Sequence, residues 1–143
     1  SLKDRLSDLI EEDTKAFNSV IAAMRLPQNT KEEKVYRETA IQTANKYAIE
    51  ITLETAEKCF RVMQLSEKLV DKGNPNSVSD AGVAAEVALA GVRGAGMNVM
   101  INLSSLEASS YVNDTQNKIN KLINDAQVLH NTIYNKTLSI IKS

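Results

Sequence analysis

Residues that interrupt helices are scarce in this chain of 143 residues. It contains 5 glycines and 2 prolines, and both prolines lie between segments with a helical spacing of apolar residues. No stretch alternates apolar and polar residues for long enough to indicate a β-strand. These shortages predict an all-α fold made of a few long helices.

Cysteine, net charge and long apolar runs are scarce as well. The single Cys59 cannot form an intramolecular disulfide, which is typical of a protein of the reducing cytoplasm. The 17 Lys and Arg residues nearly balance the 18 Asp and Glu residues, so the net charge of −1 gives no general attraction to nucleic acid or to an anionic membrane. No apolar run approaches the ~18 residues of a membrane span. We therefore expect a soluble, cytoplasmic protein that binds neither nucleic acid nor membrane.

Four segments carry apolar residues at spacings of three and four. They run from Leu2 to about Arg25, from Lys31 to about Val70, from about 78 to 104 and from about 109 to 141. They predict a bundle of long antiparallel helices. Because small residues let neighbouring helices approach closely, the Gly- and Ala-rich third segment is expected to be the central, most enclosed helix. The β-branched pair Ile51-Thr52 predicts a kink or brief break in the second segment.

The stretch from Gly73 to Ala85 combines a helix end with a helix start. It concentrates polar side chains in front of a helix of small residues: Asn74, Asn76, Ser77, Ser79 and Asp80. Ser77 with Asp80 three residues later is a capping-box pattern, which would explain both residues without a ligand. A capping box explains Asn74, Asn76 and Ser79 less well. Backbone N–H groups at a helix start, together with amide and hydroxyl groups, form a pocket mouth suited to a polar, partly anionic small molecule.

Other polar residues leave alternatives open. Asn98 and Asn102 lie four residues apart among apolar neighbours, and hydrogen bonding between helices and contact with a ligand are equal alternatives for them. Asp13 is either a carboxylate that faces a cleft or a residue just off the apolar stripe of the first helix. Cys59 is interpreted as a small buried apolar residue, and His130 lies next to the apolar seam of the last helix. That seam needs a partner helix, from the same chain or from another. The sequence contains no metal-ligand cluster, phosphate-binding glycine loop or Ser-His-Asp pattern.

Four short segments together resemble a known family. They are Ala16-Phe17-Asn18, the connection from Leu26-Pro27 to Glu33, the ten residues from Gly73 to Gly82, and the run from Asn98 to Leu103. In this order and spacing they resemble the formiminotransferase-cyclodeaminase family, specifically its cyclodeaminase domain and the stand-alone methenyltetrahydrofolate cyclohydrolases. The resemblance covers nearly all of the chain up to Leu106, and the central ten-residue motif is its most specific part.

The resemblance implies an all-helical homodimer that acts on one-carbon-substituted tetrahydrofolate. The activity would be that of a formiminotetrahydrofolate cyclodeaminase or a methenyltetrahydrofolate cyclohydrolase, with no metal and no cofactor beyond the folate substrate. Family members begin with a helical region that bears a Pro-Gly-Gly-Gly-Ser-type loop, which this sequence does not contain. We therefore expect residues 1–143 to form a single cyclodeaminase-like domain that is missing its N-terminal part.

Both reactions pass through a tetrahedral carbon, with proton transfers on either side. Such a site needs one titratable group within hydrogen-bond reach and fixed dipoles that hold the reacting carbon. Asp80 is the predicted catalytic acid-base residue. The predicted substrate-binding residues are Asn74, Asn76, Ser77, Ser79, Asn98 and Asn102. The alternative is a non-catalytic interaction module, in which the polar turn is merely capped and the last helix docks a partner.

Overall fold

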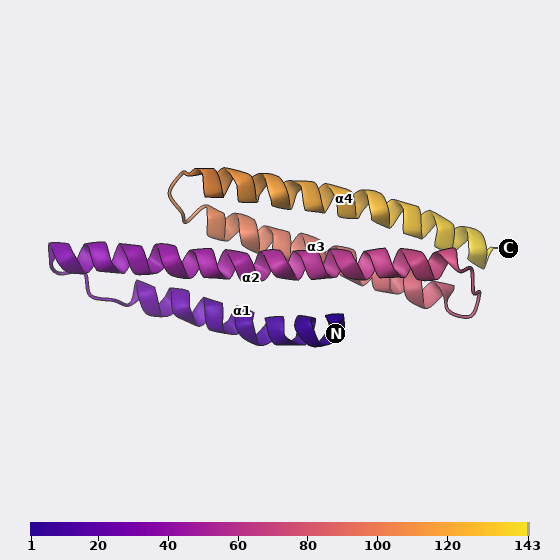
Figure 1. Cartoon of the computed structure of the whole chain (residues 1–143), viewed down its shortest axis with the longest axis horizontal. Coiled ribbons are helices and arrows are strands. Elements are labelled where there is room, and N and C mark those ends of the chain that lie inside the picture. The colour runs from indigo at the N-terminus through magenta and orange to yellow at the C-terminus, as the bar shows by residue number, and fades with distance from the viewer. Residues whose placement is uncertain (143) are drawn as a thin grey trace.

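The computed structural model of the chain describes residues 1–142 as a bundle of four long helices (Figure 1). These are α1 (Leu2–Met24), α2 (Lys31–Asp71), α3 (Val78–Leu103) and α4 (Ser110–Ile141). Each helix runs antiparallel to the one before it, and the described residues contain no strand. The predicted bundle of antiparallel helices is therefore confirmed, with boundaries close to the predicted ones. No helix in the described part of the chain combines the length and the apolar character needed to cross a membrane.

The helix at the centre of the bundle is α2. It packs against α1, α3 and α4, whereas α3 packs against α2 and α4. α2 therefore has more neighbouring helices than α3, but α3 is the most enclosed helix, as expected, because 10 of its 26 residues are buried compared with 10 of 41 in α2. With 41 residues, α2 is long enough to support all three neighbours, while one face of α3 is left uncovered.

The kink expected at Ile51-Thr52 is also absent, because α2 runs without a break from Lys31 to Asp71. Both residues are buried, and the Thr52 hydroxyl donates a hydrogen bond to the Ala48 carbonyl at 2.9 Å. Burial against neighbouring helices stabilises the helical conformation and outweighs the small propensity cost of two β-branched residues.

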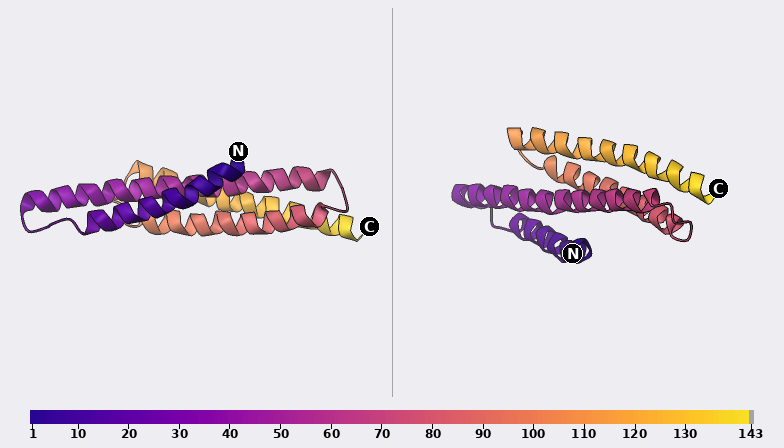
Figure 2. Two further views of the ribbon diagram at one scale, coloured as in Figure 1. Left: turned by 90° about the horizontal axis from the view of Figure 1, so that it is seen from below. Right: turned by 45° about the vertical axis from the view of Figure 1, so that its right-hand side comes forward.

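The first helix lies obliquely across α2 and covers only part of its length (Figures 1 and 2). Leu9 and Ala16 are buried against α2. The Arg5 guanidinium ties the two helices by contacting Glu12 of α1 and Glu54 of α2, both at 2.6 Å. Hydrogen bonds from Arg5 hold the pKa of both carboxyls below their usual value. The predicted apolar stripe is only partly buried, because Ile10 and Phe17 remain exposed.

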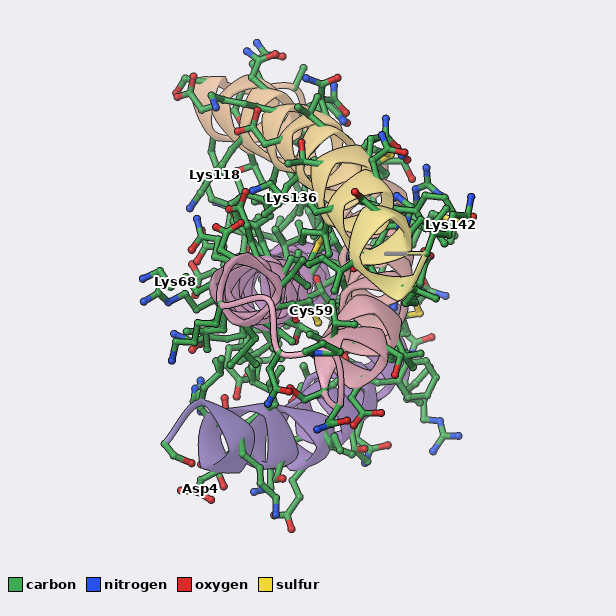
Figure 3. All side chains as sticks on the ribbon, turned by 90° about the vertical axis from the view of Figure 1, so that its right-hand side faces the viewer. Asp4, Cys59, Lys68, Lys118, Lys136 and Lys142 are labelled. Atoms are coloured by element: carbon green, nitrogen blue, oxygen red, sulfur yellow. The ribbon has the colours of Figure 1, made fainter. Side chains whose placement is uncertain are left out.

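Small residues bring α3 close to its neighbours. A Cβ atom on Gly91 would lie 2.6 Å from the Cys59 Sγ atom, and one on Gly96 would lie 2.7 Å from the Ile123 Cδ1 atom. Cys59 lies between α2 and α3 (Figure 3), and burial raises the pKa of its thiol. The interpretation of Cys59 as a buried packing residue is therefore supported.

The apolar seam of α4 is covered by helices of the same chain. Ile119, Ala126 and Ile133 are fully buried against α2 and α3. At the side of this seam Lys118 reaches Glu57 at 2.6 Å, and Lys136 reaches Asp71 at 2.7 Å (Figure 3). The partner helix that the seam requires is thus supplied within the chain.

Candidate functional site

The turn between α2 and α3 is held by its own backbone and by one asparagine. Gly73 adopts a left-handed conformation (φ 63°), which ends α2 as expected. The Asn74 carbonyl accepts hydrogen bonds from the backbone N–H groups of Ser77 at 3.1 Å and Val78 at 3.0 Å. The Asn74 side-chain oxygen accepts from the backbone N–H of Asn76 at 3.1 Å. Asn74 is therefore used to shape the turn, whereas the Asn76 side chain is exposed.

The predicted capping box at Ser77 and Asp80 does not form. Ser77 has φ −130° and ψ −1°, and its side chain makes no capping hydrogen bond. By contrast, Thr30 at the start of α2 is extended (ψ 167°) and forms a capping box with Glu33. An extended N-cap residue directs its side-chain oxygen at the first free N–H groups of the helix, and Ser77 departs from that conformation.

Asp80 is consequently not explained by capping. Its carboxylate is exposed in the first turn of α3 and forms no hydrogen bond or ion pair with any described residue of the chain. The helix dipole favours a negative charge at this position, but leaves the carboxylate oxygens open to a ligand or to water. Asp80 therefore keeps the accessibility that an acid-base residue requires.

An apolar pocket of about 200 Å³ lies beside the turn, between the first half of α3 and the last half of α4. Ser79 is at its edge, and it is the only predicted site residue that lines this pocket. His130 also lines it, with its Nε2 atom 2.6 Å from a Glu86 carboxylate oxygen and its ring stacked on Tyr134. His130 of α4 therefore contacts Glu86 of α3 beside this pocket.

A second, more polar cavity is the groove between α1 and α3. These two helices lie on neighbouring sides of α2 without packing closely against each other, and the space between them has a volume of about 410 Å³. Its polar and glycine lining comes from three helices: Asp13 and Thr14 of α1, Thr52 and Thr55 of α2, and Gly94 and Asn98 of α3. Its size is within the ~300–1,000 Å³ range of small-molecule sites. We call this cavity the α1–α3 groove.

Two polar side chains in the α1–α3 groove are unpaired. Asp13 and Asn98 form no hydrogen bond or ion pair with residues 1–142. The hydroxyls of Thr52 and Thr55 instead donate to backbone carbonyls one turn earlier in α2, both at 2.9 Å. Of the two readings of Asp13, the structure supports the carboxylate that faces a cleft. Asn98 lies across the groove from it, on a different helix.

The structure separates the predicted site residues into two groups. Asp80 and Asn98 are eighteen residues apart on α3, which is five helical turns, so they lie on the same side of the helix but about 27 Å apart. Asn102 is one turn further along and is half-buried. Within one chain, Asp80 and Asn98 therefore do not reach the same reacting atom.

The groove residues of α2 were missed by sequence reasoning. Thr52 and Thr55 are three residues apart and so share one helix face, as do Gly91 and Gly94 opposite them. Threonines on one helix opposite glycines on another were the signal that could have indicated this groove. The sequence argument instead interpreted the β-branched pair Ile51-Thr52 only as a source of a kink. Among the described residues, His, Cys, Asp and Glu side chains form no group of three or more that could ligate a metal ion.

Comparison with known proteins decides the family. The sequence profile described as formiminotransferase-cyclodeaminase matches residues 1–121. The chain belongs to the formiminotransferase-cyclodeaminase family. It is 38% identical, over 93% of its length, to a methenyltetrahydrofolate cyclohydrolase of Methylorubrum extorquens. It is 32% identical, over 86% of its length, to the formimidoyltransferase-cyclodeaminase of Rattus norvegicus.

The shared region is only part of each relative. The chain spans 64% of the Methylorubrum protein and 23% of the rat protein. A crystal structure of a formiminotetrahydrofolate cyclodeaminase from Thermotoga maritima superimposes with a TM-score of 0.71 and 21% sequence identity. That superposition covers 99% of this chain and 64% of the Thermotoga chain. It shows that the family fold is present.

Proposed function

We propose that this protein is a tetrahydrofolate one-carbon enzyme, with formiminotetrahydrofolate cyclodeaminase or methenyltetrahydrofolate cyclohydrolase activity. The observation that carries the proposal is the exposure and conformation of the motif from Gly73 to Gly82. Its turn is exposed, and the side chain of Asp80 is not used for capping. Membership of the family and the names of its relatives support folate as the substrate class.

The two candidate reactions have the same chemical requirement. In the deaminase reaction one folate nitrogen attacks the formimino carbon, and the carbon–nitrogen bond to the leaving ammonia breaks. In the hydrolase reaction water attacks the cationic methenyl carbon, and one ring carbon–nitrogen bond breaks to give the formyl product. In each reaction the attacking group loses one proton and the leaving nitrogen gains one. A single carboxyl group within hydrogen-bond reach performs both transfers. Asp80 is proposed for this role.

The other predicted residues are proposed to bind and orient the substrate. Exposed amide and hydroxyl groups at the turn are those of Asn76, Ser77 and Ser79, while the Asn74 side chain already fixes the turn. Asn98 offers a free amide in the α1–α3 groove. We also propose that the protein is a homodimer and that it works in the cytoplasm, where a free thiol such as Cys59 stays reduced.

The non-catalytic interaction module is less well supported. In that alternative the seam of α4 docks another protein, but Ile119, Ala126 and Ile133 of this seam are already buried against α2 and α3. The polar turn is also not capped by Ser77 in the way the module requires. Both features on which the alternative depends are therefore used differently in the structure.

Calorimetric titration with 5-formyltetrahydrofolate, a stable analogue of the substrates, separates the two functions. An enzyme of this class is expected to give a saturable heat, with a dissociation constant between about 1 μM and 1 mM, the range of most Michaelis constants. The control is titration with glutamate alone, which lacks the pterin ring. A folded protein that gives no heat with the folate analogue would behave as a scaffold and would contradict the proposal.

A further inference from the structure

The pocket between α3 and α4 shares no lining residue with the α1–α3 groove. It lies at the end of the bundle where α4 finishes (Figure 1), and its volume of about 200 Å³ exceeds the ~150 Å³ of an apolar cavity that admits benzene. The surface inside it is almost entirely apolar, and the polar residues of its lining are Ser79, Glu86, His130, Tyr134 and Thr137. We call it the α3–α4 pocket.

A glycine lets the two helices meet closely at this pocket. A Cβ atom on Gly82 of α3 would lie 2.9 Å from the Thr137 Cγ2 atom and 3.3 Å from the Thr137 Oγ1 atom. Both residues line the α3–α4 pocket. Thr137 therefore packs directly against the backbone of α3, and only 7% of its surface is exposed.

The hydroxyl of Thr137 has no hydrogen-bond partner among the described residues. Thr52 and Thr132 each donate to the backbone carbonyl four residues earlier, but the buried Thr137 Oγ1 atom makes no such bond. A buried hydroxyl without a partner is unfavourable and uncommon in folded proteins. Because Thr137 lines a cavity, a molecule bound in that cavity can supply the missing partner.

His130 has a second atom of this kind. Its Nε2 atom is 2.6 Å from the Glu86 Oε1 atom, but the contact lacks the direction of a hydrogen bond, and Nε2 is buried without one in the described chain. The imidazole ring stacks on Tyr134, with the ring centroids 6.0 Å apart. Because His130 and Thr137 are seven residues apart, they share one face of α4 and lie about 10 Å apart along its axis.

These features select a class of ligand. The volume accommodates one six-membered ring, and the apolar walls favour a benzene ring over a sugar. Two unpaired polar atoms about 10 Å apart suit polar groups on opposite carbons of that ring, with a hydrogen bond of about 2.8 Å added at each end. None of the described residues in the lining is Lys or Arg, and the Glu86 carboxylate repels anions. The expected ligand is therefore uncharged.

We propose that the α3–α4 pocket binds uncharged benzene derivatives with a hydrogen-bonding group at each end. One group pairs with the Thr137 hydroxyl and the other with the His130 Nε2 atom. Two sources supply this chemistry: a free aromatic amide or phenol, and the para-aminobenzoyl segment of a folate, which is also a benzene ring with polar groups on opposite carbons. The site itself does not depend on the proposed folate function.

The test uses 4-hydroxybenzamide, whose hydroxyl group both donates and accepts and so pairs with Nε2 in either tautomer of the imidazole. It is titrated into nitrogen-15-labelled protein and followed by NMR. We expect saturable changes in the amide signals of residues 79–86 and 130–141, with a dissociation constant between about 50 μM and 5 mM for a ligand of about ten non-hydrogen atoms. Absence of binding at about 10 mM, or changes centred on the α1–α3 groove, would overturn the proposal.

A matched pair of variants tests the role of the Thr137 hydroxyl. Thr137→Val keeps the shape of the side chain, and it is expected to weaken binding of 4-hydroxybenzamide about 10-fold. It is not expected to lower the melting temperature, because the hydroxyl has no partner in the described chain. The control is Thr132→Val, whose hydroxyl donates to the Val128 carbonyl at 3.2 Å and does not line the pocket; it is expected to keep wild-type affinity. Wild-type affinity in Thr137→Val would contradict the assigned contact.

A positional isomer tests the two-ended contact. 3-Hydroxybenzamide has the same composition but a shorter span between its polar groups, so it cannot reach both Thr137 and His130, and about 10-fold weaker binding is expected. Equal affinity of the two isomers would contradict pairing at both ends.

Competition identifies the source of the ring. Displacement of 4-hydroxybenzamide by 5-formyltetrahydrofolate would place the ring of the folate in the α3–α4 pocket, whereas simultaneous binding would make the pocket a separate site for a free ligand. Both results retain the site. A protein that binds 4-hydroxybenzamide but no folate would contradict the proposed function alone.

Discussion

Replacement of Asp80 by asparagine is expected to lower kcat by about 10²- to 10⁴-fold on the folate substrate that the protein turns over. Asparagine keeps the size of the side chain and its hydrogen-bonding oxygen, but it neither takes up nor releases a proton. Because Asp80 is exposed and bonds to no described residue, its replacement disturbs no packing. The expected change is therefore in turnover, with little change in the free energy of unfolding.

The matched control for this variant is Asp114→Asn, which removes an exposed carboxylate of α4 that is remote from the turn in sequence and has no bond to the described chain. It is expected to leave kcat and KM unchanged. If Asp80→Asn keeps wild-type kcat and instead lowers the free energy of unfolding by about 1 kcal/mol, Asp80 serves the helix start and is not catalytic. Steady-state kinetics and urea unfolding of the same preparations distinguish the two roles.

Replacement of Gly94 by leucine is expected to weaken folate binding by at least about 10-fold without unfolding the protein. A Cβ atom on Gly94 meets no atom within 4 Å, and Gly94 lines the α1–α3 groove. The leucine side chain therefore extends into the groove in which Asn98 is proposed to bind the substrate. A factor of ten corresponds to a binding free energy of about 1.4 kcal/mol.

The matched variant is Gly94→Ala, which adds one methyl group at the same position. Alanine is expected to preserve binding and to raise the free energy of unfolding by about 0.5–1 kcal/mol, because glycine is unfavourable inside a helix. Calorimetry measures the binding, and light scattering on the same samples separates a blocked groove from a lost dimer. Leucine at this position with wild-type affinity would show that the ligand does not use the groove.

The helices and their boundaries could be predicted because local chemistry specifies them. Apolar spacing, the Thr30–Glu33 capping box and the left-handed Gly73 all act within a few residues, and the structure contains each of them. The kink at Ile51-Thr52 was predicted wrongly from the same local rules. Contacts with other helices bury that pair, and such contacts are not visible in a propensity argument.

The candidate site was only partly predictable, for a related reason. The polar turn is a local motif and was found as one, although the conformation of Ser77 could not be read from a capping pattern. The α1–α3 groove instead depends on how α1 and α3 are placed on α2. Asp13, Thr52 and Asn98 come from three helices, and no spacing in the sequence indicates that they meet.

The exposed face of α3 was not predicted, because composition does not say which residues of a helix its own chain covers. Gly91 and Gly96 do face close neighbours in the same chain, as their abundance suggested. Val83, Val87, Met97 and Ile101 face outward instead. The pattern of small and large residues was correctly interpreted as a packing surface, but part of that surface is not used within the chain.

Turnover by the wild-type protein tests the central claim most directly. The protein is incubated separately with 5,10-methenyltetrahydrofolate, followed by the loss of its near-ultraviolet absorbance, and with 5-formiminotetrahydrofolate, followed by ammonia release. The account predicts enzyme-dependent conversion of at least one of the two, proportional to protein concentration and saturable in substrate. A folded, dimeric protein that converts neither would contradict the assignment of this chain as a folate one-carbon enzyme.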